Sequence, residues 1–450
     1  MASIPRWRIY SVRCRNVDRK DQGSLVPLNQ QETIYEKAVL VGVVTAGLSR
    51  EVVEEHLDEL QLLAETAGAK SVGRFTQRVS RINPKFFIGK GKAEQIVQQA
   101  KALDATLIIF DDELSPTQVR NYQKFTESLK VIDRTALILD IFTQHARTRE
   151  AKTQVELARL QYMLPRLTRM WTHLERQMGG IGTRAGAGET QIEVDRRLVR
   201  DRISKLKTEM KAIETERATQ SKRRGEKFRV SLLGYTNAGK STLMKALTGV
   251  DVYIKDQLFA TLDTTIRSLT LGRKREALIS DSVGFIRKLP HGLVASFRST
   301  LREAIESDLL VIVADASVQL LEQQLETVKE VISSISAGEK DSLLVLNKID
   351  ILTPEELKGL RARYPDAVFI SALEHSSLDM LKTAISDMME ESFRTAEVIF
   401  GPKRGKEISS VYDTVEVVER WYTEDGIHLK IKGERSAVGR VLLLAGNGVE

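Results

Sequence analysis

The sequence predicts an α/β protein of several domains, and three observations lead to this prediction. The chain has 450 residues, which corresponds to about two to four domains of ordinary size. Hydrophobic residues make up 42% of it and charged residues 29%, a composition typical of globular proteins. Short apolar runs alternate with amphipathic stretches, and a glycine-rich turn at 234–241 joins one such run to a helical segment.

Composition also excludes several classes of protein. The longest apolar runs, 135–142 and 309–314, are far shorter than the 18 or so residues that a membrane span needs, so we expect no span. The single cysteine, Cys14, excludes a disulfide framework, and six scattered histidines show no metal-ligand spacing. Residues 1–35 are predicted to form a basic flexible arm, and they do not contain the apolar core of a secretory signal. We expect a cytoplasmic monomer; partial membrane association and organelle targeting by the arm stay open as alternatives.

Residues 36–145 are predicted to form a small α/β subdomain. Strands are expected at 38–44, 71–79 and 106–112, and helices at 50–68 and 92–103. Ser115 followed by Pro116 is typical of a helix start. The segment GKGK at 89–92 has neither the six-residue frame nor the hydroxyl of a phosphate loop, and we interpret it as a turn into a helix.

Residues 146–217 carry two apolar seams with alternating steps of three and four, which is the pattern of a long antiparallel helical hairpin. The first seam consists of Leu157, Leu160, Leu164, Leu167, Trp171, Leu174 and Met178. The second consists of Val199, Ile203, Leu206, Met210 and Ile213. Pro165 falls inside the first seam and should kink its helix or remove one hydrogen bond.

The connection between the two seams, 179–188, holds five glycines in ten residues. Such a density allows a close backbone approach to a partner, or it makes a loose loop tip. Between 147 and 229 the chain has 21 Lys/Arg against 11 Asp/Glu, a local excess of +10 that favours a polyanionic partner. The candidate RNA-contacting residues are Arg176, Gly179, Gly180, Gly182, Arg184, Gly186, Gly188, Arg196, Arg197 and Arg200. A polar linker is expected at 218–227, and a small β-containing C-terminal domain at 396–450 with a hairpin turn near 424–426.

A nucleotide site is indicated by the motif GxxxxGK[ST] at 234–241, between a strand and a helix. Its glycines let backbone N–H groups surround phosphate oxygens at the positive end of the helix. Lys240 is expected to reach the β- and γ-phosphates, and the Ser241 hydroxyl to bind Mg²⁺. By itself, this motif does not distinguish between ATPases, kinases and GTPases.

Four further pieces in the required order select guanine. Asp281 begins a DxxG turn in which it would hold Mg²⁺ through water while the Gly284 N–H senses the γ-phosphate. Asp350 of NKID offers two carboxylate oxygens to the N1–H and N2–H₂ donors of guanine, which adenine lacks; once buried and unpaired, that carboxylate would reject ATP. A backbone N–H at 371–372 is expected to bind guanine O6. A threonine of 258–265 must reach Mg²⁺ and the γ-phosphate, and we assign this role to Thr261, with Thr264 and Thr265 as alternatives.

Together these pieces predict a Ras-like GTPase domain at 228–392. The candidate catalytic residues are Lys240, Thr261, Gly284 and Asn237, and the candidate metal ligands are Ser241, Thr261 and, through water, Asp281. The candidate GTP-binding residues are Gly234, Tyr235, Thr236, Asn237, Ala238, Gly239, Lys240, Ser241, Phe259, Ala260, Thr261, Leu262, Asp263, Asp281, Ser282, Val283, Gly284, Asn347, Lys348, Ile349, Asp350, Ser371, Ala372 and Leu373.

Two residues refine the expected chemistry. Phe285 stands where Ras-type enzymes carry the glutamine that orients the attacking water, so intrinsic hydrolysis should be slow without help from another group or a partner. Asn237 is similar to the asparagine by which some GTPases hold K⁺ beside the phosphates; the alternative is that it merely suits a turn. Mg²⁺ is therefore the expected cofactor, with K⁺ as a further candidate.

The GTPase motifs and the segment RMWTHLERQMGGIGTRAGAGETQIEVDRRL before them resemble the HflX family of ribosome-associated GTPases over about 36–395. The glycine-rich segment is the specific feature, because many families share the GTPase motifs. The resemblance implies binding to the large ribosomal subunit and its RNA, ribosome splitting, and a hairpin tip that approaches the peptidyl-transferase region. Ala187 departs from the family's usual proline, and Ser282 and Thr264 depart mildly from its usual DTVG and LDPT.

Three functions remain open at this point. The first is a GTP-driven switch that separates or rescues ribosomes. The second is an assembly GTPase that assists the large subunit without splitting anything. The third is an ATP-dependent RNA remodeller with a second nucleotide site in the N-terminal subdomain, supported only by residues 89–92.

Overall fold

The computed structural model describes most of the chain, in segments separated by undescribed stretches. The described residues are 35–126, 128–167, 191–222, 227–249, 258–259, 265–271, 275–288, 301–335, 340–401, 404–423, 426–433 and 435–446. They form two compact units. The first unit holds the described residues up to Thr208 together with Leu258, Phe259 and Lys288, and the second holds the other described residues from Glu209 on.

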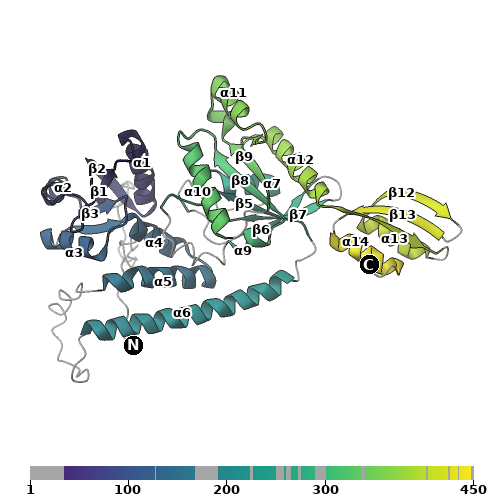
Figure 1. Ribbon diagram of the computed structural model, residues 1–450, viewed down its shortest axis with the longest axis horizontal. Coiled ribbons are helices and arrows are strands. Elements are labelled where there is room, and N and C mark those ends of the chain that lie inside the picture. The colour runs from purple at the N-terminus through teal and green to yellow at the C-terminus, as the bar shows by residue number, and fades with distance from the viewer. Residues whose placement is uncertain are drawn as a thin grey trace, which may run out of the picture. The chain divides into compact units, whose positions relative to one another are not determined.

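A parallel sheet forms the centre of the first unit (Figure 1). Its order is β2-β1-β3-β4, and its strands are β1 (Glu36–Val44), β2 (Ala69–Arg78), β3 (Leu107–Phe110) and β4 (Lys130–Asp133). Every residue of β1 from Ala38 on is buried, as is all of β3, because helices cover both faces of a parallel sheet and favour continuous apolar strands. The strands predicted at 38–44, 71–79 and 106–112 are thereby confirmed, while β4 was not predicted.

The described helices around this sheet are α1 (Arg50–Thr66), α2 (Lys90–Ala102), α3 (Pro116–Phe125) and α4 (Arg134–His145). Three of them begin at a side-chain cap, and α2 begins after Gly89 without one. Ser115 and Gln118 form a capping box at α3, which confirms the predicted start, and Asp133 caps α4. Gly89 directly precedes α2, so the segment GKGK is a turn into a helix, as predicted.

The middle region is helical. It consists of α5 (Arg149–Met163), a 3₁₀ turn (Leu164–Arg166) and α6 (Gln191–Lys222). The α-helix ends two residues before Pro165 instead of kinking through it, because the proline ring clashes with a continuing helix. Leu157 and Leu160 of the predicted first seam are buried, whereas its members Trp171, Leu174 and Met178 lie outside the described residues.

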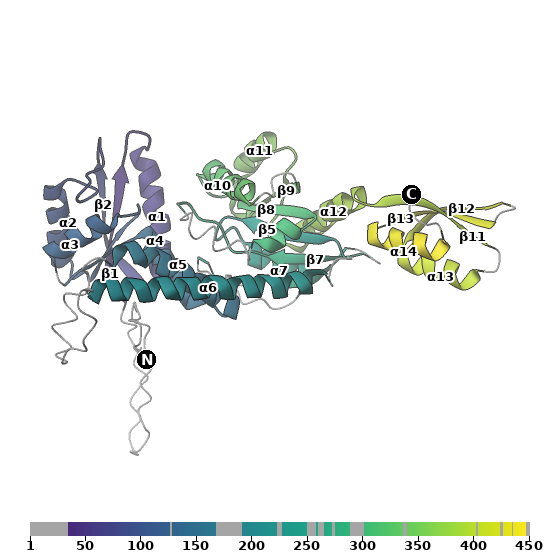
Figure 2. The same ribbon diagram turned by 60° about the horizontal axis from the view of Figure 1, so that its bottom comes forward.

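Helix α6 buries the predicted second seam at Ile203, Leu206, Met210 and Ile213. Arg202 joins it to α5 through two hydrogen bonds to the Glu156 carboxylate, at 2.8 and 2.9 Å, and Figures 1 and 2 show the two helices side by side. The first five residues of the linker predicted at 218–227 continue this helix to Lys222. Neither glycine nor proline occurs there to end it.

The second unit is built on a six-stranded sheet of order β10-β9-β8-β5-β7-β6, parallel except for β6. The strands are β5 (Arg229–Gly234), β6 (Thr265–Thr270), β7 (Glu276–Asp281), β8 (Leu309–Asp315), β9 (Asp341–Asn347) and β10 (Val368–Phe369). The helices are α7 (Lys240–Thr248), α9 (Arg302–Glu306), α10 (Leu321–Ser334), α11 (Pro354–Arg363) and α12 (His375–Glu391). The apolar sides of α7 and α12 share one core on the sheet, and those of α9 and α10 share another. This architecture confirms the predicted P-loop α/β fold.

The C-terminal part of this unit has a three-stranded antiparallel sheet of order β11-β13-β12 with two helices packed on it. Its elements are β11 (Arg394–Phe400), α13 (Gly405–Thr414), β12 (Glu416–Thr423), β13 (Gly426–Gly433) and α14 (Arg435–Ala445). Strands β12 and β13 pair antiparallel on either side of the hairpin turn predicted near 424–426. No helix in the described part of the chain is long and apolar enough to cross a membrane.

Candidate functional site

The loop between β5 and α7 has the backbone shape of a phosphate loop. Gly234 adopts a φ of +152°, and a Cβ there would lie 2.0 Å from the Val313 carbonyl oxygen. Gly239 adopts a φ of +90°, and its Cβ would lie 2.3 Å from the side-chain nitrogen of Asn347. Because neither position can hold a side chain, both motif glycines are required by close approach of other groups. Asn237, with a φ of 62°, is exposed at the turn of the loop.

Lys240 is buried at the start of α7 and its ammonium group faces the loop. The Nζ atom donates hydrogen bonds to the carbonyl oxygens of Gly234 at 3.1 Å and Tyr235 at 2.7 Å. Burial lowers the pKa of Lys240 to about 8, and the nearby Asp281 carboxylate acts in the opposite direction. An anionic phosphate beside this group would stabilise its charged form.

Two oxygen groups predicted as Mg²⁺ ligands lie together. The Ser241 hydroxyl donates to Asp281 Oδ2 at 2.7 Å, and Asp281 is fully buried at the end of β7. A hydroxyl and a carboxylate are the hard oxygen ligands that Mg²⁺ prefers, alongside water and substrate phosphates. No cluster of three His, Cys, Asp or Glu side chains that could hold a metal by itself occurs within the described segments. The donor set therefore fits a magnesium ion that is shared with a nucleotide.

Asn347 connects the phosphate loop to the predicted guanine loop. Its Nδ2 donates to the Ala238 carbonyl at 2.9 Å, and its Oδ1 accepts from the Ala372 N–H at 2.9 Å. The backbone N–H predicted for guanine O6 is therefore engaged by Asn347 in this structure. Sequence reasoning missed this bridging role, which the asparagine of the NKID motif could have indicated.

The residues around the predicted base site differ in exposure. Asp350 is exposed, and its burial by a bound base stays a prediction. Lys348 has a φ of 66° and forms an ion pair with Asp315 at 2.7 Å. Ser371 is fully buried and accepts from the Leu373 N–H at 3.3 Å, so its side chain shapes the loop. Ile349 and Leu373 complete the predicted set, and Leu373 is 77% exposed.

The DxxG turn lies against the phosphate loop. The Ser282 hydroxyl donates to the Leu232 carbonyl at 2.7 Å, and Val283 is buried. A Cβ on Gly284 would come within 2.8 Å of the Thr236 side chain and 3.1 Å of Lys240 Nζ, which leaves room only for glycine. This glycine is thus placed beside the lysine that is expected to contact the β- and γ-phosphates.

Phe285 is a core residue and not a water-orienting one. Its side chain is buried with Leu233 and Leu310. Its backbone carbonyl accepts from the Thr236 N–H at 2.7 Å, and its N–H donates to the Gly234 carbonyl at 3.0 Å. Two residues later, the Arg287 N–H donates to the Tyr235 hydroxyl at 2.7 Å, a contact that the motifs do not predict.

Other predicted residues are not joined to this set. Phe259 belongs to the first unit, where its buried ring packs edge-on against Phe142 with centroids 4.6 Å apart; its predicted nucleotide contact stays a prediction. An aromatic side chain this apolar is more stable in a core than beside a phosphate. The predicted residues Ala260, Thr261, Leu262 and Asp263 lie outside the described residues.

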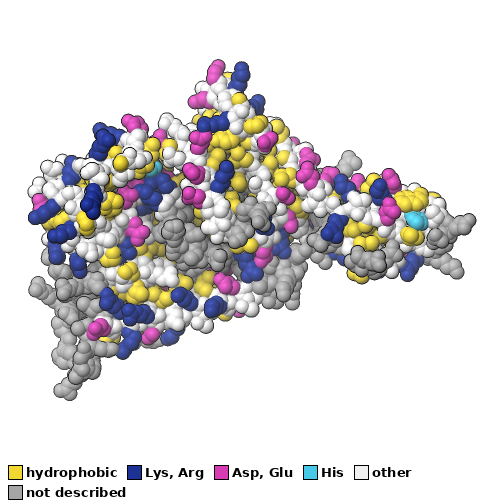
Figure 3. Space-filling model, in the orientation of Figure 1, with side chains coloured by type: hydrophobic (Ala, Val, Ile, Leu, Met, Phe, Trp, Pro, Cys, Tyr) yellow, Lys and Arg dark blue, Asp and Glu magenta, His cyan; other side chains and the backbone are white. Residues whose placement is uncertain are grey.

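Of the predicted RNA-contacting residues, three are described. Arg196, Arg197 and Arg200 lie in the first third of α6, where Arg197 and Arg200 are exposed and Arg196 is half-buried. Figure 3 shows Lys and Arg side chains, with some Asp and Glu, over the surface of this helix. The remaining seven, which are Arg176, Gly179, Gly180, Gly182, Arg184, Gly186 and Gly188, lie outside the described residues.

Comparisons with known protein families match three consecutive parts of the chain. Residues 54–143 match the family described as GTP-binding GTPase N-terminal, and residues 145–224 match the GTP-binding GTPase Middle Region. Residues 229–348 match the family described as 50S ribosome-binding GTPase.

Individual relatives match over most of their length. GTPase HflX of Escherichia coli is 42% identical over 395 residues, covering 87% of this chain and 92% of that protein. GTPase HflX of Flavobacterium psychrophilum is 52% identical over 322 residues, covering 71% of this chain and 77% of that protein. Among solved structures, a GTP-binding protein from Sulfolobus solfataricus in complex with GDP is 26% identical, with a TM-score of 0.41, and covers 78% of this chain and 98% of that one.

Proposed function

The chain belongs to the HflX family of GTPases, and from this premise we propose that it binds the large ribosomal subunit and uses the GTP cycle to separate or rescue ribosomes. The match of residues 229–348 to 50S ribosome-binding GTPases carries the ribosomal part of the proposal. The local excess of +10 between 147 and 229 supports it, because ribosomal RNA is a polyanion. We expect this activity in the cytoplasm.

Hydrolysis of GTP follows from the geometry of the phosphate loop. The loop shaped by the glycine torsions and the buried Lys240 would hold the phosphates, and Ser241 and Asp281 would hold the Mg²⁺ that neutralises phosphate charge. We propose that the Gly284 N–H senses the γ-phosphate and that Thr261 completes the metal site. Since Phe285 is locked in the core, a partner or another group must orient the water, and the large subunit is the partner that we propose.

We propose K⁺ as a second ion, with Asn237 as a ligand. If this is right, hydrolysis rises when Na⁺ is exchanged for K⁺ at fixed ionic strength, and the difference disappears in Asn237→Ala. Because Asn237 has a φ of 62°, which glycine adopts without strain, Asn237→Gly is the matched comparison: it removes the whole side chain, the ligand oxygen included, while it keeps the turn. A K⁺ response that survives in Asn237→Gly would mean that the asparagine merely suits the turn.

The ribosomal proposal is tested by gradient sedimentation of purified 70S ribosomes with the full-length protein. With a non-hydrolysable GTP analogue, we expect 30S and 50S peaks to grow at the expense of 70S, and with GDP we expect 70S to remain. Binding to 50S without loss of 70S would instead support the assembly function. The ATP-dependent alternative would require the same separation with an ATP analogue.

A further inference from the structure

The turn at 111–114, directly after β3, carries three consecutive carboxylates: Asp111, Asp112 and Glu113. It belongs to the first unit and ends at Leu114, whose buried N–H donates to the Asp133 carboxylate at 3.0 Å. The other end is held by sheet pairing, since the Asp111 N–H donates to the Val41 carbonyl at 2.9 Å. The backbone of this acidic turn is thus tied to the sheet at both ends.

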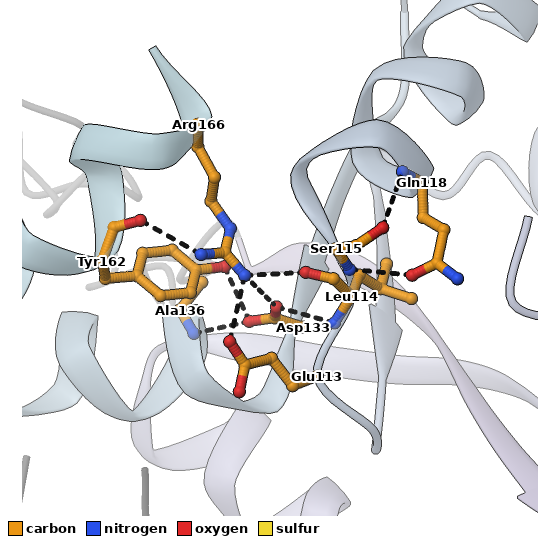
Figure 4. A network of polar contacts seen from close by, with 8 residues as sticks. All are labelled: Glu113, Leu114, Ser115, Gln118, Asp133, Ala136, Tyr162 and Arg166. Carbon is orange, nitrogen blue, oxygen red and sulfur yellow. Dashed lines mark hydrogen bonds and ion pairs between the residues drawn. The ribbon is translucent and has the colours of Figure 1, made fainter. Parts of the chain in front are cut away.

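One side of the acidic turn holds Arg166, the next-to-last described residue before 168–190. Arg166 Nη2 donates to the Leu114 carbonyl at 2.7 Å and to Glu113 Oε1 at 3.2 Å. Figure 4 shows its guanidinium lying over the ring of Tyr162, with the central carbon 3.6 Å from the ring centroid. Planar stacking and directed hydrogen bonds together fix the orientation of this side chain. The end of the 3₁₀ turn after α5 is therefore attached to the acidic turn.

Asp133 makes this attachment rigid. It is fully buried and accepts from the Ala136 N–H at 2.9 Å and from the Tyr162 hydroxyl at 2.8 Å, in addition to Leu114, and its Oδ2 lies 3.4 Å from Arg166 Nη2 (Figure 4). Burial raises the pKa of Asp133, while these partners act to lower it. A buried carboxylate with this many partners leaves few alternative arrangements for the groups around it.

The other side of the acidic turn holds Lys288. Its Nζ lies 3.0 Å from Asp111 Oδ2 and also pairs with Asp112. Lys288 belongs to the first unit, and it has a left-handed φ of 54° that non-glycine residues rarely adopt. It follows Gly284 of the DxxG turn closely, with only three residues between them.

We propose that the acidic turn couples the DxxG turn to the segment that follows α5, with Lys288 and Arg166 as the positioning residues on its two sides. A change at Gly284 on GTP binding alters the hold of Lys288 on Asp111 and Asp112, and the turn transmits this change to Arg166. The inference rests on the proposed function in one respect, namely that the segment after Arg166 is the one that contacts ribosomal RNA. The coupling itself does not depend on the ribosome.

The first test is made on the free full-length protein by hydrogen exchange. We expect exchange in peptides covering Tyr162–Leu167 to differ between the GTP-analogue and GDP forms. Lys288→Met, which keeps the chain length and removes the charge, should lose this difference while the difference at 281–287 remains. Asp112→Asn removes the charge of the partner of Lys288 and should also lose the exchange difference at Tyr162–Leu167. Lys130→Met, which removes an ion pair with Glu36 in the same unit, is the matched control and should keep the difference.

The second test measures affinity for 50S subunits. In the wild type we expect tighter binding to 50S with the GTP analogue than with GDP. In Lys288→Met and Arg166→Met, the ratio of these two affinities should fall about tenfold. The double variant should lose no more than either single variant, because both residues act through one turn. Basal hydrolysis should stay within about twofold.

The outcomes separate the two proposals. Nucleotide-independent exchange at Tyr162–Leu167 in the wild type, or an unchanged difference in Lys288→Met, would overturn the coupling. Losses that multiply in the double variant would also overturn it. A wild type that shows the exchange difference but binds 50S equally in both nucleotide states would leave the coupling standing and remove the proposed function.

Discussion

The two parallel sheets of this protein present opposite chemistry at the ends of their strands. In the GTPase sheet, the turn after β5 holds two glycines with unusual torsions and the buried Lys240. In the N-terminal sheet, the turn after β3 holds three carboxylates, and cations of the same chain bind to them. Ligands of open α/β sheets bind outside the carboxyl ends of the strands. By charge, only the first of these two edges suits a nucleotide.

This difference teaches that architecture alone does not assign a nucleotide site. Both sheets have helices packed on them, and both have lysines after glycines, at 89–92 and at 239–240. Gly89, however, simply precedes α2, and Lys90 is exposed and paired with Glu94 at 3.7 Å. The described residues of the N-terminal subdomain therefore form neither a phosphate loop nor a positively charged sheet edge that could bind ATP. This weakens the alternative of an ATP-dependent RNA remodeller.

The sharpest way to break this comparison is to remove one lysine from each sheet. Lys240→Ala should weaken GTP binding by about 2–4 kcal/mol, because a charge-assisted contact to the phosphates is lost. Lys90→Ala should leave GTP affinity within about twofold and create no loss of ATP binding. Calorimetric titration of both variants with GTP and ATP checks this. A loss of nucleotide affinity in Lys90→Ala would restore the second site.

A somewhat smaller effect is expected at the base. Asp350→Asn should weaken GTP binding by about 1–3 kcal/mol, since a charge-assisted pair with guanine is lost. Binding of xanthosine triphosphate should improve, because its C2 oxygen accepts from the new amide. Because Asp350 is exposed, we expect the variant to fold like the wild type. Unchanged kcat/KM for GTP would show that the NKID loop does not select the base.

The smallest expected effect is on stability and concerns Asp140 of α4, a carboxyl group to which we assign no part in ligand binding. Burial raises the pKa of Asp140 to about 6, with Arg159 and Lys130 acting in the opposite direction. A carboxyl with a raised folded pKa destabilises the fold as pH rises from about 4 to 6, and the penalty stays constant above that. Asp140→Asn should thus stabilise α4 by about 1–2 kcal/mol at pH 7.5 and by nothing measurable at pH 4. Amide exchange of α4 in the intact protein checks this, and equal gains at both pH values would contradict it.

The sequence predicted the fold class and the loops that carry the motifs, whereas it did not predict the packing of individual side chains around them. The glycines of the phosphate loop and the DxxG turn lie against Val313, Asn347 and Thr236, which are all distant in the sequence. The motifs nevertheless predict these glycines, because the motif spacing marks the positions where the loops need glycine. The bridge from Asn347 to Ala372, the burial of Phe259 against Phe142 and the exposure of Asp350 depend on tertiary packing. No spacing rule reveals such contacts.

The elements that the sequence missed are short or ambiguous. Strand β4 has only four residues, and its apolar neighbour 135–142 forms α4 because Asp133 caps a helix there. Helix α6 continues through residues expected to be a linker, since polar composition by itself does not end a helix. In the C-terminal part, β11 and α14 were not predicted as separate elements, although Gly401 and Pro402 directly after β11 mark its end.

The central claim is that the GTPase site supplies the switch and the glycine-rich segment supplies the contact with the ribosome. It is tested most directly by replacing 179–188 with a plain short turn and measuring subunit separation of 70S ribosomes by gradient sedimentation, with loading of the GTP analogue confirmed. We expect normal nucleotide binding and basal hydrolysis, because the GTPase sheet has its own core, together with loss of separation. Full separation by this variant would contradict the claim and reduce the segment to a spacer.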